Sequence, residues 1–319
     1  MCATRDGGWL IGQGVATAFY PAYRFPASAR VRLYADGTAV VQCAAQEMGM
    51  GTATVQTQHA AERLGLPMEK VRFEYGDTNL PQAPVAGGSN QTVSIALAVQ
   101  MACEKLNREL HKLVEGEPRS PLESAKFEEL EAREGGLFRK DRREKGESYA
   151  SILSRAKKSF VEAEADSGQP VESLKYSMGS YGAQFCEVRV NELSGEVRVS
   201  RWVGAFDTGR ILNPKTARSQ FMGGITMGIG MALTEETYFD ERVGRIINPS
   251  LAEYHVPVNL DIPRIEAYFL DIPDPHTPLG AHGIGEIGIT GAAAAVANAV
   301  YHATGKRIRD LPITLDKLM

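Results

Sequence analysis

The feature that most constrains the fold is a unit that occurs twice in the sequence: a β-hairpin, a glycine-containing turn and a helix. In the first copy, residues 30–33 alternate and residues 39–43 are apolar and β-branched, on either side of the turn dipeptide Asp36-Gly37. Apolar residues at helical spacing follow over residues 51–64. Such a unit buries the apolar sides of hairpin and helix against one another.

The second copy has the same order of elements. Residues 185–190 and 197–203 alternate on either side of Ser194-Gly195, and a helix starts at Asn213-Pro214 and continues to Leu233. Strands and helices do not alternate strictly along the chain, as a doubly wound sheet would require. The pattern therefore predicts a duplicated α+β architecture, with two lobes of hairpin plus helix.

Between and after these units the sequence predicts further elements. Strands are expected over residues 71–75 and 265–270, and helices over 92–113, 149–160 and 291–303. The last helix is almost entirely alanine and valine, so we expect it to be buried on all sides.

The stretch over residues 115–147 is dense in charge and poor in apolar residues, which is typical of a solvated helical excursion or a mobile linker. The predicted organisation is a first α+β lobe over residues 1–115, the charged excursion or linker over 116–175, and a second α+β lobe over 176–319.

Charge and composition argue against two classes of partner. The formal net charge of −4 over 319 residues gives no global positive field to attract nucleic acid or an anionic membrane. The longest apolar stretches are shorter than the ~20 residues that a bilayer span needs, and the first residues lack the apolar core of a signal peptide. We expect no nucleic acid and no membrane among the partners, and a cytoplasmic location.

The four cysteines lie far apart, with no C-x-x-C pair and none at zinc spacing from a histidine. They are Cys2, Cys43, Cys103 and Cys186. We expect buried, reduced thiols and neither an iron–sulfur cluster nor a structural zinc held by this chain.

Two glycine-rich segments precede predicted helices. In residues 46–52, glycines flank Met50 where backbone N–H groups and the helix N-terminus could approach an anion; a plain tight turn explains the same residues. In residues 86–92, Ser89 and its small neighbours suit phosphate, although a simple helix cap is an equal alternative. Neither segment has the context of a P-loop or a Rossmann fingerprint.

A third segment, residues 207–215, combines a glycine turn with Arg210, the helix cap Asn213 and Lys215 in the first helical turn. Cations are unfavourable in a first turn, so the segment predicts an anion site, with a capped surface helix as the alternative.

A fourth segment, residues 280–291, surrounds Glu286 with glycine and apolar residues. An enclosed carboxylate has a raised pKa, as a general base requires, unless Glu286 is simply a helix-leading carboxylate. His282 could carry a proton or be structural. Met222, Met227 and Met231 fit packing better than metal ligation.

These segments, in this order, resemble the molybdenum-binding subunit of the xanthine dehydrogenase and aldehyde oxidase family. The similarity is greatest to bacterial aldehyde dehydrogenases that use molybdopterin cytosine dinucleotide. It covers residues 10–14, 44–52, 87–89, 179–220 and 280–314. The resemblance implies the second half of a molybdenum cofactor-binding domain, because nothing in this sequence resembles the half that precedes it in the family.

The resemblance also assigns residues. Glu286, in Gly-Ile-Gly-Glu, matches the family's catalytic glutamate, a base that helps oxygen from water attack the substrate carbon. No side chain of this chain is expected to ligate the metal. The cofactor-contacting loops match Gly49, Met50, Gly51, Thr52, Gly88, Ser89, His282, Gly283, Ile284 and Gly285. The region expected to hold the phosphates and cytidine of the dinucleotide matches Gly209, Arg210, Ile211, Leu212, Asn213, Pro214, Lys215 and Ser219.

Two departures bear on the substrate. Met50 and Met227 stand where many relatives have glutamine, and a thioether donates no hydrogen bond. The resemblance therefore favours a small aldehyde as substrate over a purine.

The resemblance implies partners as well: subunits that carry a 2Fe-2S cluster and FAD, and a chain or segment that supplies the missing N-terminal half. A partner's export signal would make a periplasmic location the alternative. Two other functions stay open from the residues themselves. One is a catalytically inert half-site that acts as a scaffold or cofactor chaperone, and the other is an unrelated phosphate-ligand module.

Overall fold

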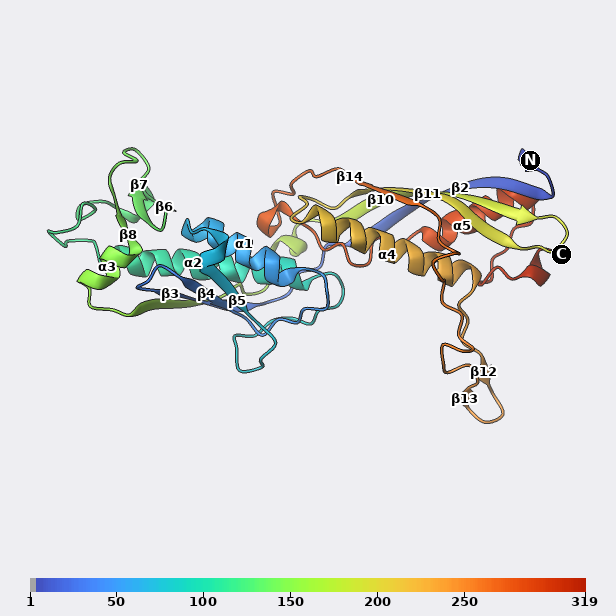
Figure 1. The fold of residues 1–319 in the computed structure, drawn as a ribbon, viewed down its shortest axis with the longest axis horizontal. Helices are drawn as coiled ribbons and strands as arrows, with labels where there is room; N and C mark the ends of the chain where they lie inside the picture. Colours follow the sequence, from blue (N-terminus) through green and yellow to red (C-terminus); the bar gives the residue numbers. More distant parts are fainter. Residues whose placement is uncertain (1–3) are drawn as a thin grey trace. The chain divides into compact units, whose positions relative to one another are not determined.

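The computed structural model describes residues 4–319, which form two compact units that we describe separately. Unit 1 contains the described residues up to Ala22, then Met178–Asp274 and Ile284–Met319. Unit 2 contains Tyr23–Ser177 and Pro275–Gly283. Each unit combines an open sheet with two long helices, which confirms the predicted α+β class (Figure 1).

Unit 1 is built on a five-stranded sheet. Its strands are antiparallel except for the last pair, and they lie in the order β1 (Thr4–Asp6), β2 (Trp9–Pro21), β10 (Gly179–Asn191), β11 (Val197–Asp207) and β14 (Ile265–Phe269). The predicted second hairpin is thus confirmed as β10–β11.

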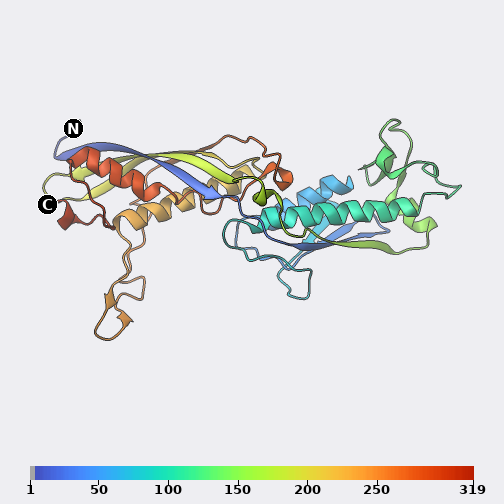
Figure 2. The same ribbon diagram turned by 180° about the vertical axis from the view of Figure 1, so that it is seen from behind.

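Two helices, α4 (Pro214–Leu233) and α5 (Ala292–Thr304), share one core with this sheet. Gly12 and Gly14 of β2 let α5 lie directly on the strand, because a Cβ on either would overlap helix backbone (Figure 2). The expectation that α5 is buried on all sides is wrong, since Ala294 is exposed. The predicted packing of the α4 methionines is also wrong: Met227 is 62% exposed, and Met222 and Met231 are exposed too.

Unit 2 is built on a four-stranded sheet in the order β5 (Val71–Glu74), β4 (Ala39–Gln42), β3 (Ser28–Tyr34) and β9 (Phe160–Asp166). Helices α1 (Thr52–Leu64) and α2 (Gln91–Lys112) share one core with it, which confirms the predicted first hairpin and both helices. Ion pairs cross β3 and β9, such as Arg30 with Glu164 at 2.8 Å.

The charged segment is folded. It forms a three-stranded sheet of β6 (Leu130–Arg133), β7 (Gly136–Arg139) and β8 (Gly146–Ser148), followed by α3 (Tyr149–Arg155). Its few apolar residues, including Leu130 and Leu137, join the core of unit 2. The segment is therefore neither a helical excursion nor a linker, and the observed units divide the chain differently from the boundaries at residues 115 and 175.

Smaller features complete the fold. The hairpin β12 (Phe239–Asp240) and β13 (Arg245–Ile246) extends away from α4 within unit 1 (Figure 1).

Cys43, Cys103 and Cys186 are buried free thiols as expected, while Cys2 lies outside the described residues. None of the helices described is both long and apolar enough to cross a membrane. The 3-10 helices are η1 (Met68–Lys70), η2 (Phe127–Glu129), η3 (Glu172–Leu174), η4 (Pro278–Gly280) and η5 (Leu315–Lys317).

Candidate functional site

Unit 2 brings together the two glycine-rich segments that precede its helices. The hydroxyl oxygens of Thr52 and Thr92, one at the start of each helix, are 2.5 Å apart. Gln56 Nε2 donates to the Thr92 carbonyl at 2.8 Å, and Gln91 Nε2 donates to Gln46 Oε1 at 2.7 Å. These bonds join the turn over residues 46–52 to the loop over residues 86–92, so the two predicted cofactor loops lie against one another.

A third predicted segment reaches the same place from far along the sequence. A Cβ built on Gly283 would lie 1.3 Å from the Ser89 carbonyl oxygen, so only glycine fits there. Ser89 itself has φ 53°, a left-handed conformation that costs a side-chain-bearing residue about 1–2 kcal/mol. Strain of this kind concentrates at functional sites. Gly88, Ser89, His282 and Gly283 therefore belong to one constellation in unit 2.

The turn over residues 46–52 is organised by a residue that the sequence analysis missed. Glu47 Oε1 accepts hydrogen bonds from the backbone N–H groups of Gly49 and Gly51 at 2.9 and 3.0 Å, and Oε2 accepts from Ala53 N–H at 3.0 Å. Burial opposes ionisation, but these backbone donors outweigh it and lower the pKa of Glu47. Gly49 and Gly51 adopt φ of 106° and 86°, which the turn requires.

The predicted use of the backbone N–H groups of this turn to bind an anion is therefore wrong. The N–H groups that were expected to face a ligand already bond to the Glu47 carboxylate. The turn can contact a ligand through Met50, which is half-buried, and through the glycine backbone surfaces. A carboxylate directly before a two-glycine turn and a helix start is the signal that could have identified Glu47.

In unit 1, the start of α4 carries a cluster of positive charge. Asn213 Oδ1 accepts from Lys215 N–H at 3.1 Å and from Thr216 N–H at 3.3 Å, so the predicted cap is confirmed. Arg210, Lys215 and Arg218 are exposed, and among residues 4–319 none of the three has a carboxylate within 4.0 Å.

The loop before α4 is held by a hydrogen bond to a residue distant in the sequence. Ile211 N–H donates to Asp271 Oδ1 at 2.8 Å. The hydroxyl of Thr208, beside Gly209, is buried with no hydrogen-bond partner in the part of the chain described here. Buried polar groups of this kind ordinarily bond to ordered water or a ligand. The cations and this hydroxyl fit a polar anionic group, as the sequence predicted for Gly209, Arg210, Ile211, Leu212, Asn213, Pro214, Lys215 and Ser219.

Glu286 also lies in unit 1, on the loop that leads into α5. Its neighbours Ile287 and Gly288 are buried, and a Cβ on Gly288 would lie 2.7 Å from the Phe221 carbonyl oxygen of α4. Glu286 itself is half-buried and Gly285 is exposed. The full enclosure that the glycine-rich sequence predicted is therefore incomplete in this chain, whereas the loop beneath Glu286 is tightly packed.

The predicted residues divide between the units. Unit 2 holds Gly49, Met50, Gly51, Thr52, Gly88, Ser89, His282 and Gly283, and unit 1 holds Ile284, Gly285, Glu286 and the residues at the start of α4. Within residues 4–319, no group of three histidine, cysteine, aspartate or glutamate side chains is placed to hold a metal ion.

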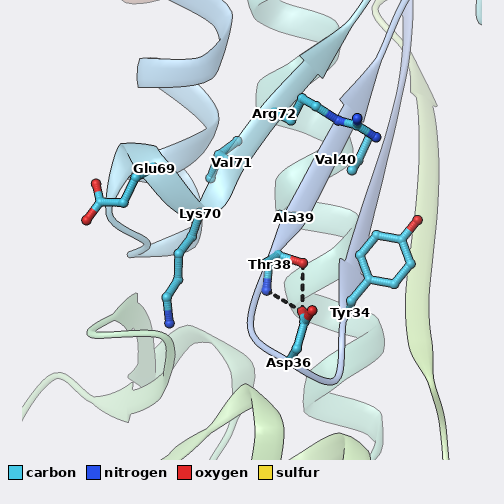
Figure 3. Close-up of a pocket in the computed structure, with 9 residues that line it drawn as sticks. All are labelled: Tyr34, Asp36, Thr38, Ala39, Val40, Glu69, Lys70, Val71 and Arg72. Carbon is cyan, nitrogen blue, oxygen red and sulfur yellow. Dashed lines mark hydrogen bonds between the residues drawn. The ribbon is translucent and has the colours of Figure 1, made fainter.

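A cavity of about 380 Å³ lies elsewhere in unit 2, beside the β3–β4 turn (Figure 3). Asp36 in its wall accepts from the backbone N–H and the hydroxyl of Thr38 at 2.9 and 2.6 Å, and Lys70 and Arg72 line the other side. None of the predicted site residues lines this cavity.

Comparison of the sequence with protein families and curated proteins gave consistent matches. Residues 2–263 match the family described as "Molybdopterin cofactor-binding domain". The chain is 40% identical over 316 residues to the aldehyde oxidoreductase molybdenum-binding subunit PaoC of Escherichia coli (strain K12). It is 33% identical over 327 residues to the xanthine dehydrogenase molybdenum-binding subunit of Escherichia coli O157:H7. Each match covers 99% of this chain, but only 41% and 43% of the respective relative.

Solved structures agree on the fold. Quinoline 2-oxidoreductase from Pseudomonas putida 86 superposes with a TM-score of 0.84 and 26% identity, over 97% of this chain and 41% of that chain. The aldehyde oxidoreductase from Desulfovibrio gigas superposes with a TM-score of 0.75 and 26% identity, over 98% of this chain and 32% of that chain. This chain therefore spans less than half the length of these similar proteins.

Proposed function

The chain belongs to the molybdopterin cofactor-binding domain family, and from this premise we propose that it forms the C-terminal cofactor-binding part of a molybdenum hydroxylase that oxidises aldehydes to carboxylic acids. The observation that carries the proposal is the packing of Gly283 against Ser89, which joins predicted cofactor loops from distant parts of the sequence. The 40% identity to a subunit described as an aldehyde oxidoreductase supports the substrate class.

The residues present fit an anionic dinucleotide cofactor. Arg210 and Lys215 at the start of α4, with no carboxylate within 4.0 Å in the described residues, would bind its phosphates, and the Thr208 hydroxyl would gain a partner. In unit 2, the close packing of Gly283 on Ser89 gives the predicted cofactor loops a fixed backbone conformation. When bound, the cofactor supplies a molybdenum centre that accepts two electrons from the substrate.

Glu286 is the proton acceptor in this proposal. The overall reaction converts an aldehyde and water into a carboxylic acid, two protons and two electrons. A Glu286 carboxylate oxygen takes the proton that the attacking, water-derived oxygen loses. The packed loop beneath Glu286 holds the carboxylate in place, while its half-exposed position leaves room for a substrate. Met50 and Met227 donate no hydrogen bond, which favours aldehydes over purines.

The two electrons must leave through other groups. We propose that these are a 2Fe-2S cluster and FAD on partner chains, and that the cofactor is the cytosine dinucleotide form. The three described cysteines of this chain are unsuited to a cluster, because all are buried and burial raises the pKa of Cys43 and of Cys103 to about 12.

A further chain or segment would complete the site, corresponding to the part of the relatives that this sequence does not span. The face of the unit 1 sheet opposite α4 and α5 carries exposed apolar side chains, namely Val15, Phe19, Tyr181 and Phe185. The rings of Phe19 and Tyr181 are 5.4 Å apart across the β2–β10 pair. Solvated sheet faces are normally polar, so this face supports a polypeptide partner.

The test is analysis of molybdenum and of hydrolytically released cytidine monophosphate in the chain purified from its native host, alone and with co-purifying chains. We expect molybdenum and nucleotide in equal amounts in the complex, together with aldehyde turnover. Complexes that lack both would contradict the proposal and point to an inert half-site. Nucleotide without molybdenum would indicate a different phosphate-ligand module.

A further inference from the structure

We propose that Gln184 of β10 is the positioning residue for Glu286. This inference rests on the proposed function, in that it takes Glu286 as the base. Gln184 lies about a hundred positions before Glu286 in the sequence, and neither the glycine-rich segments nor the family resemblance assigned it a role. Its role emerges from the loop over residues 286–291, which carries Glu286 between the sheet and α5.

The side-chain amide of Gln184 makes three hydrogen bonds inside unit 1. The residue is 0% exposed. Its Nε2 donates to two carbonyl oxygens of the loop, that of Gly288 at 2.9 Å and that of Thr290 at 2.7 Å. Its Oε1 accepts from the indole Nε1 of Trp202 on β11 at 3.0 Å, and Trp202 is also wholly buried. The two loop carbonyls themselves require the N–H groups of the amide to face the loop, and the Trp202 bond satisfies the oxygen on the other side.

These hydrogen bonds attach the loop to the sheet, and packing holds the loop from two other sides. A Cβ on Gly288 would lie 2.7 Å from the Phe221 carbonyl oxygen of α4, and one on Gly291 would lie 2.3 Å from the Thr17 carbonyl oxygen of β2. The loop backbone therefore rests directly on neighbouring backbone. Packing prevents the loop from moving closer to its neighbours. The hydrogen bonds to Gln184 prevent it from moving away from them.

Gln184 bonds to the loop close to Glu286 in the sequence, so it can control the position of the Glu286 backbone. The first carbonyl held by Gln184 belongs to Gly288, two residues after Glu286, and the N–H of Ile289 donates back to the Glu286 carbonyl at 3.2 Å. A shift at Gly288 is therefore passed directly to the Glu286 backbone. Proton transfer requires hydrogen-bond distance, and a misplacement of about 1 Å lowers a rate by as much as about 100-fold.

The test uses the complete enzyme with its partner chains and cofactor. Gln184→Met replaces the amide by an apolar side chain of similar length and leaves the loop carbonyls without donors. We expect kcat for the aldehyde to fall about 10- to 100-fold, with KM within about twofold and molybdenum content unchanged. Trp202→Phe is the matched control, because it removes one hydrogen bond of the same network but leaves both bonds to the loop; it should lose much less kcat.

Hydrogen–deuterium exchange provides a readout that does not depend on activity. Residues 285–291 should exchange faster in Gln184→Met than in the wild type or Trp202→Phe, while β2 and α5 keep their protection. Should Gln184→Met fail to fold, Gln184→Glu, which keeps the shape and the acceptor for Trp202, should show the same two effects.

Two outcomes would overturn the inference: full kcat in a folded Gln184 variant, or a loss of kcat with unchanged exchange over residues 285–291. Failure of the proposed function has a different signature. In that case Glu286→Gln would leave turnover intact, whereas the exchange experiment would still report whether Gln184 holds the loop.

Discussion

Gly283 shows how one residue can connect distant parts of the sequence. It has no room for a side chain, because Ser89 occupies the position that a Cβ would take. Family resemblance alone placed Gly283 and Ser89 in cofactor loops, without a physical reason for the glycine. The structure supplies that reason in a contact between residues that no local pattern links.

Gly283→Ala should displace the Ser89 loop. We expect overpacking to cost about 1–3 kcal/mol of stability and molybdenum content in the assembled enzyme to fall. Gly87→Ala is the matched control, since Gly87 lies in the same loop and the nearest atom to its Cβ position is 3.9 Å away. Thermal unfolding and metal analysis of both variants make the comparison. Equal molybdenum content in the two would contradict a role for the Ser89–Gly283 contact.

His59 makes the stability of unit 2 depend on pH. Burial in α1, with a smaller effect of the nearby Arg63 guanidinium, lowers the pKa of His59 from 6.5 to about 4. The unfolded chain therefore binds a proton between pH 6.5 and 4 that the folded chain does not. Stability from this residue is complete above pH 6.5 and falls as the pH drops toward 4, by roughly 3 kcal/mol.

Urea unfolding of His59→Leu and wild type across this pH range measures the effect. The variant should show a shallower loss of stability on acidification. An unchanged slope in His59→Leu would show that other groups cause the acid sensitivity.

At the scale of elements, local periodicity predicted the hairpins β3–β4 and β10–β11, each with a turn dipeptide, but it missed β1 and β2 although Asp6-Gly7 stands at their turn. Strand β9 was missed although it alternates, with Val161 and Ala163 buried and Glu162 and Glu164 outside. Its partner β3 lies far back in the sequence, so the ion pairs that satisfy its glutamates are invisible locally. Strands β6, β7 and β8 were missed for a different reason: they pair with close neighbours in the sequence, but they are only three or four residues long and lie in a highly charged segment.

The charged segment, which was predicted wrongly, ends in a buried ion pair of Glu147 that should contribute strongly to stability. Its carboxylate accepts from Ser120 Oγ at 2.7 Å and from Ser151 Oγ at 2.9 Å, and pairs with Arg155; the two charged side chains are only 6% and 11% exposed. Glu147→Ala should destabilise unit 2 by about 3–5 kcal/mol, because it leaves Arg155 buried without its counter-charge. Glu134→Ala, at an exposed pair, should cost less than about 1 kcal/mol. Denaturant unfolding distinguishes the two.

At the scale of the whole molecule, the chain passes from unit 1 to unit 2, returns, and revisits unit 2 with Pro275–Gly283. The sequence predicted two α+β lobes, but it did not predict that Pro275–Gly283 joins unit 2. A short segment without regular periodicity does not indicate which core it packs against. The same limit applies to the site. Glycine-rich motifs located its loops. Glu47 lies inside one of these motifs but was given no role, and Gln184 lies on a strand outside the glycine-rich segments; both hold the loops through backbone hydrogen bonds.

The central claim is that Glu286 acts as the base of an aldehyde-oxidising molybdenum enzyme. The most direct test is the kcat of a Glu286→Gln variant in the fully assembled, cofactor-loaded complex, measured beside its molybdenum content. We expect kcat to fall at least about 100-fold, as when a general base is removed, while the molybdenum content stays at the wild-type level. Turnover within a few-fold of the wild type at equal molybdenum content would contradict it.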